Sequence, residues 1–343
     1  AWDGKSRVNI LLLGLDYSAK RQKEGQGSPL SDTMILVTVD PLSRTIGAMS
    51  IRRDLWVNIP GFDYNKINSA YTLGEDYQLP GGGPGLAMET VEGLLGIPID
   101  YYARVDLSTF VTVIDEIGGI PITLTQRMLL DWEGNGNKFW IEPGYYILPG
   151  SHALAYARTR DEDYGDGDIA RGNRQMEVIM AIRDRVLTVN ALPNLIAKAP
   201  VLYQTISAGL QTNMSLDQAI QLAWLVVQIP RENMQTYNID YTVAEPTNTP
   251  DGIYILRPIP DQLRLLRDRM FTSTGVAAAP IVIETTTGQA VDPLTLSQDE
   301  TASIEVLNGT ASAGLADTTA AYLATQGLTV ASTGNTDLTD STT

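Results

Sequence analysis

Short, almost continuous apolar runs recur in the N-terminal part of the chain. The first covers residues 8–13, and two more cover residues 34–39 and 45–51. Such runs indicate strands that are buried on both faces of a sheet. Because only a short turn at Asp40-Pro41 separates the second run from the third, we expect these two strands to pair antiparallel and the sheet to be mixed.

Segments with helical periodicity follow these strands. Ser151 and Ser215 are the expected N-caps of two of them, since a serine side chain accepts a hydrogen bond from the first amide groups of a helix. The predicted helices are 66–71, 86–95, 107–117, 151–158, 172–187, 192–207 and 215–229. The further predicted strands are 99–105, 121–124 and 235–239, with a loop or hairpin at 131–150. The sequence therefore predicts an α/β fold.

The composition changes at about residue 272. Residues 272–300 are rich in Thr, Ala, Pro and Gln, which is typical of a linker. A strand and turn at 303–310, a helix at 315–325 and a strand at 328–330 follow, and one β-α-β unit of this size is too small for a full core. We predict a main domain at 1–271, a linker at 272–300 and a truncated second domain at 301–343.

The charge is distributed unevenly along the chain. An apolar fraction of 43% and a charged fraction of 19% are typical of a globular protein. The net charge of −16 argues against nucleic-acid binding, which needs a basic surface. Half of that charge follows residue 271, where there are eight acidic residues and no Lys or Arg. The basic groups are therefore confined to the predicted main domain.

The chain contains no Cys, which fits an extracytoplasmic protein that avoids thiols. No apolar run reaches the roughly 18 residues of a membrane helix, and no signal peptide is visible. The sequence opens at Ala1-Trp2-Asp3, without a Met and almost directly on a strand. We expect that an N-terminal membrane anchor has been removed.

Four arginines and a glutamine lie on either side of a loop rich in Gly and Asp. Arg158 and Arg160 are two residues apart, so on an extended segment they point to the same side. Arg171, Arg174 and Gln175 share one face of a helix. Arginine suits phosphate oxygens, but these guanidinium groups can also pair with the acids of the loop on a solvated surface. Spacing alone favours neither the phosphate site nor the solvated surface pairs.

Two carboxylates flank a polar loop between the first two strands. Asp16 follows the first strand and Asp32 precedes the second. Two carboxylates plus phosphate oxygens are a usual ligand set for Mg²⁺, although each residue alone is at least as readily a turn or cap residue. Arg53 follows the third strand and is well placed to reach the same site. The alternative interpretation is a surface ion pair with Asp54, which would contribute little to stability. Together with Lys66 and the arginine cluster, the pattern favours a site for pyrophosphate and Mg²⁺.

His152 is the only histidine. Because the chain has one His and no Cys, we exclude Ser-His-Asp sites, Cys-His sites and zinc sites of the usual ligand sets. His152 itself lies in a segment with helical character, where a structural or surface role is the favoured interpretation.

Six motifs occur in the order in which they stand in the LytR-CpsA-Psr family. They are Leu13-Gly14-Leu15-Asp16, Ser31-Asp32-Thr33-Met34, Ser50-Ile51-Arg52-Arg53-Asp54, Lys66-Ile67-Asn68-Ser69-Ala70-Tyr71, Tyr156-Ala157-Arg158-Thr159-Arg160 and Arg171-Gly172-Asn173-Arg174-Gln175. Each motif alone is weak, but six in order make the resemblance specific over residues 8–187. Residues 302–335 also resemble the C-terminal domain of LytR-like members.

The resemblance implies an enzyme anchored in the membrane and facing outward. Such an enzyme transfers a glycopolymer from a polyprenyl-pyrophosphate carrier onto peptidoglycan or a related wall acceptor. The implied fold is a mixed sheet sandwiched by helices, with an apolar groove for the prenyl chain. The helices 107–117 and 192–207 can line that groove or equally belong to the plain core.

The resemblance also assigns roles to individual positions. It implies Asp16 and Asp32 as ligands of Mg²⁺. The implied pyrophosphate contacts are Arg53, Arg158, Arg160 and Arg171, with Lys66 and Gln175 in support. The implied catalytic residues are Arg53, Arg158, Arg160 and Asp32.

This chain departs from the family at two positions. Leu30 and Ser18 stand where the family commonly has arginines, so either nearby loop cations replace them or the activity is weaker. Two other functions stay open: a pyrophosphatase that uses water as acceptor, and a non-catalytic protein that binds polyprenyl phosphate. A transcriptional regulator fits poorly with the acidic charge and the lack of a helix-turn-helix pattern.

Overall fold

The computed structural model describes most of the chain in detail. The described residues are 4–15, 29–131, 136, 138–159, 167–188, 209–272, 304–308, 316–317, 319–320 and 330–335. The chain divides into two compact units, Ala1–Ala277 and Ala278–Thr343.

A mixed sheet of six strands forms the centre of the first unit. The strand order is β11-β6-β1-β2-β3-β12. The pairs β1–β2, β2–β3 and β11–β6 are antiparallel, whereas β1–β6 and β12–β3 are parallel. The strands are β1 (Val8–Leu15), β2 (Ser31–Asp40), β3 (Thr45–Ile51), β6 (Tyr101–Asp106), β11 (Leu210–Thr212) and β12 (Met234–Asn238).

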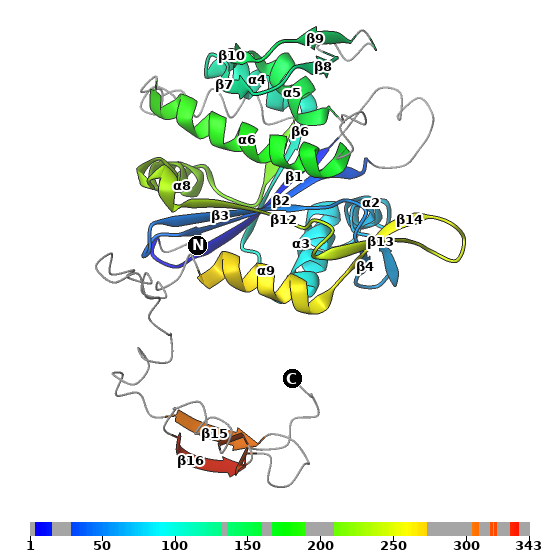
Figure 1. Cartoon of the computed structure of the whole chain (residues 1–343), viewed down its shortest axis with the longest axis vertical. Coiled ribbons are helices and arrows are strands. Elements are labelled where there is room, and N and C mark those ends of the chain that lie inside the picture. Colours follow the sequence, from blue (N-terminus) through cyan, green and yellow to red (C-terminus); the bar gives the residue numbers. More distant parts are fainter. Residues whose placement is uncertain are drawn as a thin grey trace, which may run out of the picture. The chain divides into compact units, whose positions relative to one another are not determined.

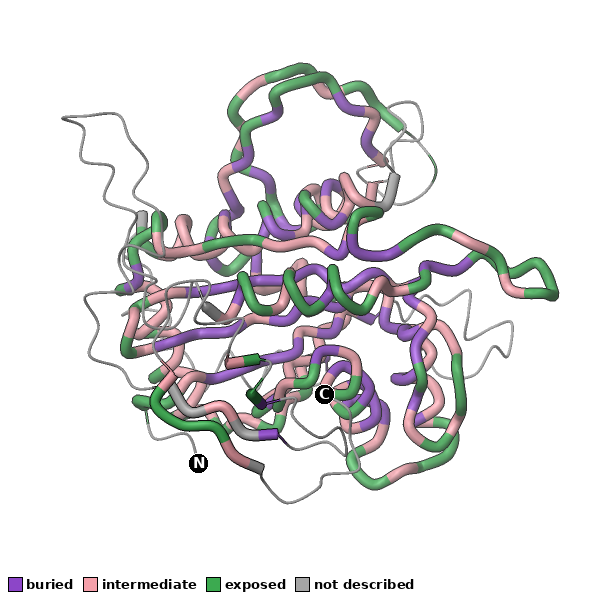
Figure 2. Tube along the Cα trace, turned by 60° about the horizontal axis from the view of Figure 1, so that its bottom comes forward, coloured by how far each residue is buried: buried purple, intermediate pink, exposed green. Residues whose placement is uncertain are grey.

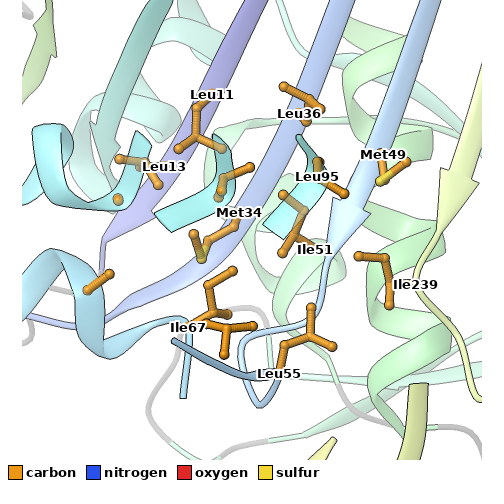
Figure 3. Close-up of a cluster of buried hydrophobic side chains, with 14 of the residues drawn as sticks. Leu11, Leu13, Met34, Leu36, Met49, Ile51, Leu55, Ile67, Leu95 and Ile239 are labelled. Carbon is orange, nitrogen blue, oxygen red and sulfur yellow. The ribbon is translucent and has the colours of Figure 1, made fainter. Parts of the chain in front are cut away.

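Both faces of this sheet are buried, which explains the apolar runs in the sequence. Side chains alternate across a strand, so Leu11 and Leu13 lie on one face of β1 and Ile10 on the other. Figure 3 shows the first face, where Leu11, Leu13, Met34, Leu36, Met49 and Ile51 gather from the three central strands. In Figure 2 the buried positions likewise follow the central strands, and exposed positions follow the outer sides of the helices.

Helices cover the sheet on both sides, as Figure 1 shows. On one side Leu86, Val91 and Leu263 join the core under the sheet, and on the other Met176 and Leu222 do so. The first side carries α2 (Ser69–Asp76), α3 (Gly82–Leu95) and α9 (Pro260–Thr272). The second carries α6 (Gly167–Thr188) and α8 (Leu216–Gln228).

A smaller layer with its own core lies beyond α6. Ile114, Ile122, Leu130, Ala153 and Val178 belong to this core. Its elements are α4 (Leu107–Glu116), β7 (Ile120–Leu124), β8 (Met128–Leu130), β9 (Phe139–Ile141), β10 (Gly144–Leu148) and α5 (Gly150–Arg158). The strands pair as β7–β10 and β8–β9, both antiparallel.

The structure confirms the mixed α/β sandwich and the antiparallel second and third strands. The cap at Ser215 is also confirmed, because its side chain accepts from the Gln218 amide at 3.3 Å in a reciprocal capping box. The predicted cap at Ser151 is wrong. Helix α5 begins one residue earlier, at Gly150, whose amide donates to the Asp115 carboxylate at 2.7 Å. A side chain from α4 therefore satisfies the amide that starts this helix.

Three further elements differ from the sequence prediction. Lys66 ends a short strand instead of starting a helix. A hairpin and helix α9, neither of which was predicted, follow the strand at 235–239. Helix α9 was missed although Leu263, Leu266 and Met270 have helical spacing. The remaining short strands of the first unit are β4 (Trp56–Asn58), β5 (Tyr64–Lys66), β13 (Ala244–Asn248) and β14 (Tyr254–Pro258).

The second unit contains two parallel strands, β15 (Ile304–Asn308) and β16 (Val330–Asn335). Parallel strands need a crossover connection, in agreement with the predicted β-α-β unit, and 316–317 and 319–320 are helical. The predicted helix 192–207 and residues 273–300 of the predicted linker lie outside the described residues. Among the helices that the structure describes, none combines the length and apolarity that crossing a membrane requires.

Candidate functional site

Five of the predicted site residues meet in one pocket, called here the cationic pocket. It has a volume of about 440 Å³. Its lining residues are Gly14, Leu15, Asp32, Thr33, Arg53, Leu107, Lys138, Arg158, Arg171 and Gln175. Four of these ten residues are basic and one is acidic, so the pocket favours an anion.

The sheet brings the first half of this lining together. Strands β1, β3 and β6 end at one edge of the sheet, and the antiparallel β2 begins there. Leu15, Asp32, Arg53 and Leu107 therefore leave neighbouring strands at the same edge. Ligands of open α/β sheets bind at the carboxyl ends of the strands, which is this edge.

Arg53 joins two carboxylates at the pocket. Its Nη1 donates to Asp32 Oδ1 at 2.9 Å, and its Nε lies 3.5 Å from Asp54 Oδ2. Lys66 Nζ donates to Asp54 Oδ1 at 2.7 Å. The Asp54 side chain is only 11% exposed, so the Arg53–Asp54 contact is not the solvated pair that the sequence left open. Lys66 supports the site through Asp54 and is not among the described residues of the pocket lining.

Helices α5 and α6 bring the second half of the lining. Arg158 is the last residue of α5, in agreement with the predicted helix 151–158. Arg171 and Gln175 lie on one face of α6, and Gln175 Nε2 donates to Thr33 Oγ1 at 3.1 Å. Arg174 has a structural role instead, because its buried guanidinium donates to the carbonyl of Thr159.

A buried tyrosine links the two helices behind the pocket. Tyr156 on α5 donates to Glu177 Oε2 on α6 at 2.5 Å. Burial and this carboxylate together raise the pKa of Tyr156 well above its ordinary value, so the hydroxyl keeps its proton at neutral pH. The contact joins α5, which carries Arg158, to α6, which carries Arg171.

The structure adds Lys138 to the predicted set and leaves two members undescribed. Lys138 lies just before β9 and was missed, although it is the one basic residue between 128 and 150 in the sequence. Asp16 and Arg160 lie outside the described residues, as do the loop acids from 161 to 166. Arg53, Arg158 and Arg171 line one pocket.

Two other titratable groups lie near the site elements. Partial burial alone would raise the pKa of Asp106, but hydrogen bonds from Thr109 and Ser108 and the nearby Arg104 hold it below its ordinary value. The charged Asp106 caps α4, whose first residue Leu107 lines the pocket. Burial lowers the pKa of His152, and this residue is not among those described in the lining.

Asp32 is the carboxylate through which the described part of the pocket can hold a divalent cation. Its side chain is 35% exposed and lines the pocket. Within the described residues, no group of three or more acidic, His or Cys side chains gathers as a metal cage. Mg²⁺ is commonly held by one or two carboxylates plus substrate phosphates, so Asp32 fits such an ion when an anionic ligand is bound.

A second, apolar pocket lies between the sheet, α4, α6 and α8. Its volume is about 470 Å³, and among its described lining residues only Arg183 and Gln235 are not apolar. Val113 of α4 and Ile117, which follows this helix, belong to this lining. Helix α6 serves both pockets: Arg171 and Gln175 line the cationic one, and Ile179, Ile182 and Val186 follow on the same helix face in the apolar one.

Comparison with known proteins agrees with this geometry. The sequence model described as the LytR_cpsA_psr family matches residues 2–271. This chain belongs to the LytR_cpsA_psr family. A second model, described as LytR cell envelope-related transcriptional attenuator, matches residues 301–343.

Members of the LytR_cpsA_psr family with known names and structures are similar over most of the chain. The Bacillus subtilis polyisoprenyl-teichoic acid–peptidoglycan teichoic acid transferase TagT is 32% identical over 281 residues, covering 80% of this chain and 79% of TagT. A structure of TagT bound to LIIa-WTA has 29% identity and a TM-score of 0.63, covering 80% of this chain and 94% of that one. A structure of YwtF (TagT) with bound octaprenyl pyrophosphate lipid has 28% identity and a TM-score of 0.58, with the same coverage.

Proposed function

We propose that this chain transfers a glycopolymer from a polyprenyl-pyrophosphate carrier onto peptidoglycan or a related cell-wall acceptor. The observation that carries the proposal is the pair of pockets along α6, one cationic and one apolar. Gln175 and Ile179 are four residues apart, which is about 6 Å along a helix axis. A ligand with an anionic head and a long apolar tail fits this arrangement. The names and ligands of the TagT relatives support it.

The pyrophosphate is assigned to the basic side chains of the cationic pocket. Arg53, Arg158 and Arg171 supply charge-assisted hydrogen bonds, and Lys138 adds a fourth cation. Gln175 and, through Asp54, Lys66 keep the site in shape. Arg160 completes the predicted set. The prenyl chain is assigned to the apolar pocket, where it would be removed from water.

Asp32 would hold Mg²⁺ together with the pyrophosphate oxygens, and Asp16 is our proposed second ligand. Bound there, the ion would neutralise part of the negative charge of the pyrophosphate. Arg53 Nη1 lies 2.9 Å from Asp32 Oδ1, so the guanidinium that would contact the pyrophosphate also holds this carboxylate in place.

The reaction exchanges the phosphoanhydride bond of the pyrophosphate for a phosphodiester bond to the acceptor. The oxygen of an acceptor hydroxyl forms a bond to the glycan-linked phosphorus, and the bond from that phosphorus to the bridging oxygen breaks. Polyprenyl phosphate leaves with the negative charge on that oxygen, where Arg53, Arg158 and Arg171 can stabilise it. The acceptor proton passes to a base, for which Asp32 is our candidate. Because the proposed acceptor belongs to the cell wall, we propose that the activity lies at the outer face of the cell membrane.

The test uses the whole chain, an octaprenyl-pyrophosphate-linked disaccharide and soluble peptidoglycan fragments. Arg158→Ala and Arg171→Ala are each expected to lower transfer at least about 100-fold, as for loss of a group that stabilises the charge of the transition state. Arg264→Ala, which breaks an exposed 2.8 Å pair with Asp261 on α9, is the matched control and should retain activity.

The same assay separates the proposed function from its alternatives. Product linked to peptidoglycan identifies a transferase, whereas release of product without acceptor identifies a pyrophosphatase. Binding without turnover would identify a carrier protein and refute the proposal. Chelation of divalent cations should stop transfer, and added Mg²⁺ should restore it; full activity after chelation would remove Mg²⁺ from the proposal.

A further inference from the structure

Two exposed tyrosines lie on segments that adjoin Arg52 and Asp54, the neighbours of Arg53 in the sequence. Tyr241 follows β12 and is 49% exposed, and Tyr254 begins β14 and is 43% exposed. Isolated exposed aromatic residues are common on protein surfaces. These two differ because several contacts hold their rings in place.

The backbone around Tyr241 is a fixed turn. Asp240 Oδ1 accepts from the Thr242 amide at 2.8 Å and from the Thr242 hydroxyl at 2.6 Å. The guanidinium carbon of Arg52 lies 5.5 Å from the centre of the Tyr241 ring, and Arg52 itself is 7% exposed. The hydroxyl groups of Tyr254 and Tyr241 lie close enough to interact with each other. A buried cation thus holds one ring while about half of the tyrosine remains exposed.

The tyrosines belong to the same sheet edge as the cationic pocket. Strands β3 and β12 are parallel, and the Ile239 amide donates to the Ser50 carbonyl at 3.2 Å. The chain leaves both strands at this edge, towards Arg52 and Tyr241. Arg52 contacts Tyr241, and the next residue, Arg53, lines the pocket.

A second connection runs through Asp54. Its carboxylate contacts Arg53 and Lys66 and lies close enough to act electrostatically on the Tyr254 hydroxyl. The Leu256 amide also donates to the Asp54 carbonyl at 2.9 Å, which fixes β14 beside this segment. Both tyrosines therefore lie beside the segment 52–54, which carries Arg53 into the cationic pocket.

We propose that Tyr241 and Tyr254 form a saccharide-binding subsite beside the pyrophosphate. A sugar ring offers an apolar face of C–H groups that can stack on an aromatic ring, and hydroxyl groups that can hydrogen-bond with a phenol. Tyrosine presents both an apolar face and a polar tip, which is why it is common where a ligand is partly apolar and partly wet. The proposal rests on the proposed function, since both the carrier-linked glycan and the wall acceptor contain sugars.

The decisive experiment compares two ligands by titration calorimetry. One is octaprenyl pyrophosphate, and the other is octaprenyl pyrophosphate linked to a disaccharide. Tyr241→Ala should bind the sugar-free lipid as the wild type does. It should bind the sugar-linked lipid about fivefold more weakly, which corresponds to an aromatic contact of about 1 kcal/mol.

Two further variants guard against a merely structural effect. Tyr241→Trp keeps an aromatic face and should restore the affinity for the sugar-linked lipid. Tyr145→Ala removes a tyrosine that is 67% exposed on β10, outside both pockets as the described residues define them, and should change neither affinity.

The source of the sugar is decided by a kinetic measurement with soluble peptidoglycan fragments. A KM for the acceptor that rises about fivefold in Tyr241→Ala, with unchanged binding of the sugar-linked lipid, assigns the subsite to the acceptor. If neither quantity changes, or if both lipids bind equally more weakly, the subsite is refuted. A wild-type protein that binds neither lipid would instead overturn the proposed function and the subsite with it.

Discussion

Replacement of Arg53 by Met tests the cationic pocket most directly. The change keeps an unbranched side chain and removes the guanidinium that contacts both Asp32 and Asp54. Stability should change by less than about 1 kcal/mol, because the Arg53–Asp32 pair is partly exposed and Asp54 retains a second cation, Lys66. The Arg53 and Asp32 side chains are 26% and 35% exposed, and the buried Asp54 keeps its bond to Lys66.

The affinity for pyrophosphate should change much more than the stability. A hydrogen bond to a charged group is worth about 1.5–3 kcal/mol, and partial exposure of Arg53 favours the lower end of this range. A loss of about 1.5–2 kcal/mol corresponds to about 13- to 30-fold weaker binding. Titration of octaprenyl pyrophosphate gives the affinity, and denaturant unfolding gives the stability.

Two controls make the outcome specific. Arg53→Lys keeps the charge but cannot bridge two carboxylates, so it should lie between the wild type and Arg53→Met. Arg257→Met breaks a 3.5 Å pair with Glu245 whose side chains are 60% and 54% exposed, and it should leave the affinity unchanged. Wild-type affinity in Arg53→Met would contradict the assignment of the pocket, as would an equal loss in Arg257→Met.

Three other predictions concern the scaffold that positions the pocket. The folded-state pKa of Tyr156 is raised, so the stabilisation from its protonated hydroxyl is complete below about pH 10 and is lost at about 1.4 kcal/mol per pH unit above that pH. Denaturant unfolding at pH 8 and pH 11 should therefore show a fall in the free energy of unfolding that is smaller in Tyr156→Phe than in the wild type. Equal falls in the two proteins would contradict this assignment. Ser215→Ala removes the capping box of α8 and should cost about 1 kcal/mol, measured as a lower denaturant midpoint; an unchanged midpoint would show that the cap is dispensable. In Gly150→Ala the new Cβ would lie 2.7 Å from Val111 Cα, so we expect the free energy of unfolding to fall by at least about 2 kcal/mol. In Gly93→Ala no described heavy atom outside the local helix lies within 4 Å of the new Cβ, so the free energy of unfolding should rise by up to about 1 kcal/mol. Similar effects of the two changes on the denaturant midpoint would contradict this packing argument.

The accuracy of the sequence-based prediction varied with how local the determining interaction was. Ser215 was correctly assigned as a cap because its partner Gln218 is three residues away. Ser151 was wrongly assigned because the acceptor that starts α5 is Asp115, on another helix. Helix α9 was missed although it begins at Pro260 with Asp261 next to it, both of which favour a helix start.

The same distinction applies to the candidate site. Arg53, Arg158 and Arg171 could be chosen from the sequence because their motifs resemble those of the family. Their common environment depends on a sheet whose strands β1, β2 and β3 bring distant segments to one edge. Lys138 lacked a motif and could be recognised only once its hairpin was in place.

The sequence by itself determined the buried strands, the family and the basic residues that can meet a pyrophosphate. These properties follow from apolar periodicity and residue type, which are local. Only the tertiary structure decided that Arg174 supports a carbonyl while Gln175 faces the pocket. It also decided that Arg52 holds Tyr241 while the adjacent Arg53 faces the anion site. Neighbouring residues of one type take different roles because the elements packed against them differ, and those elements come from distant parts of the chain.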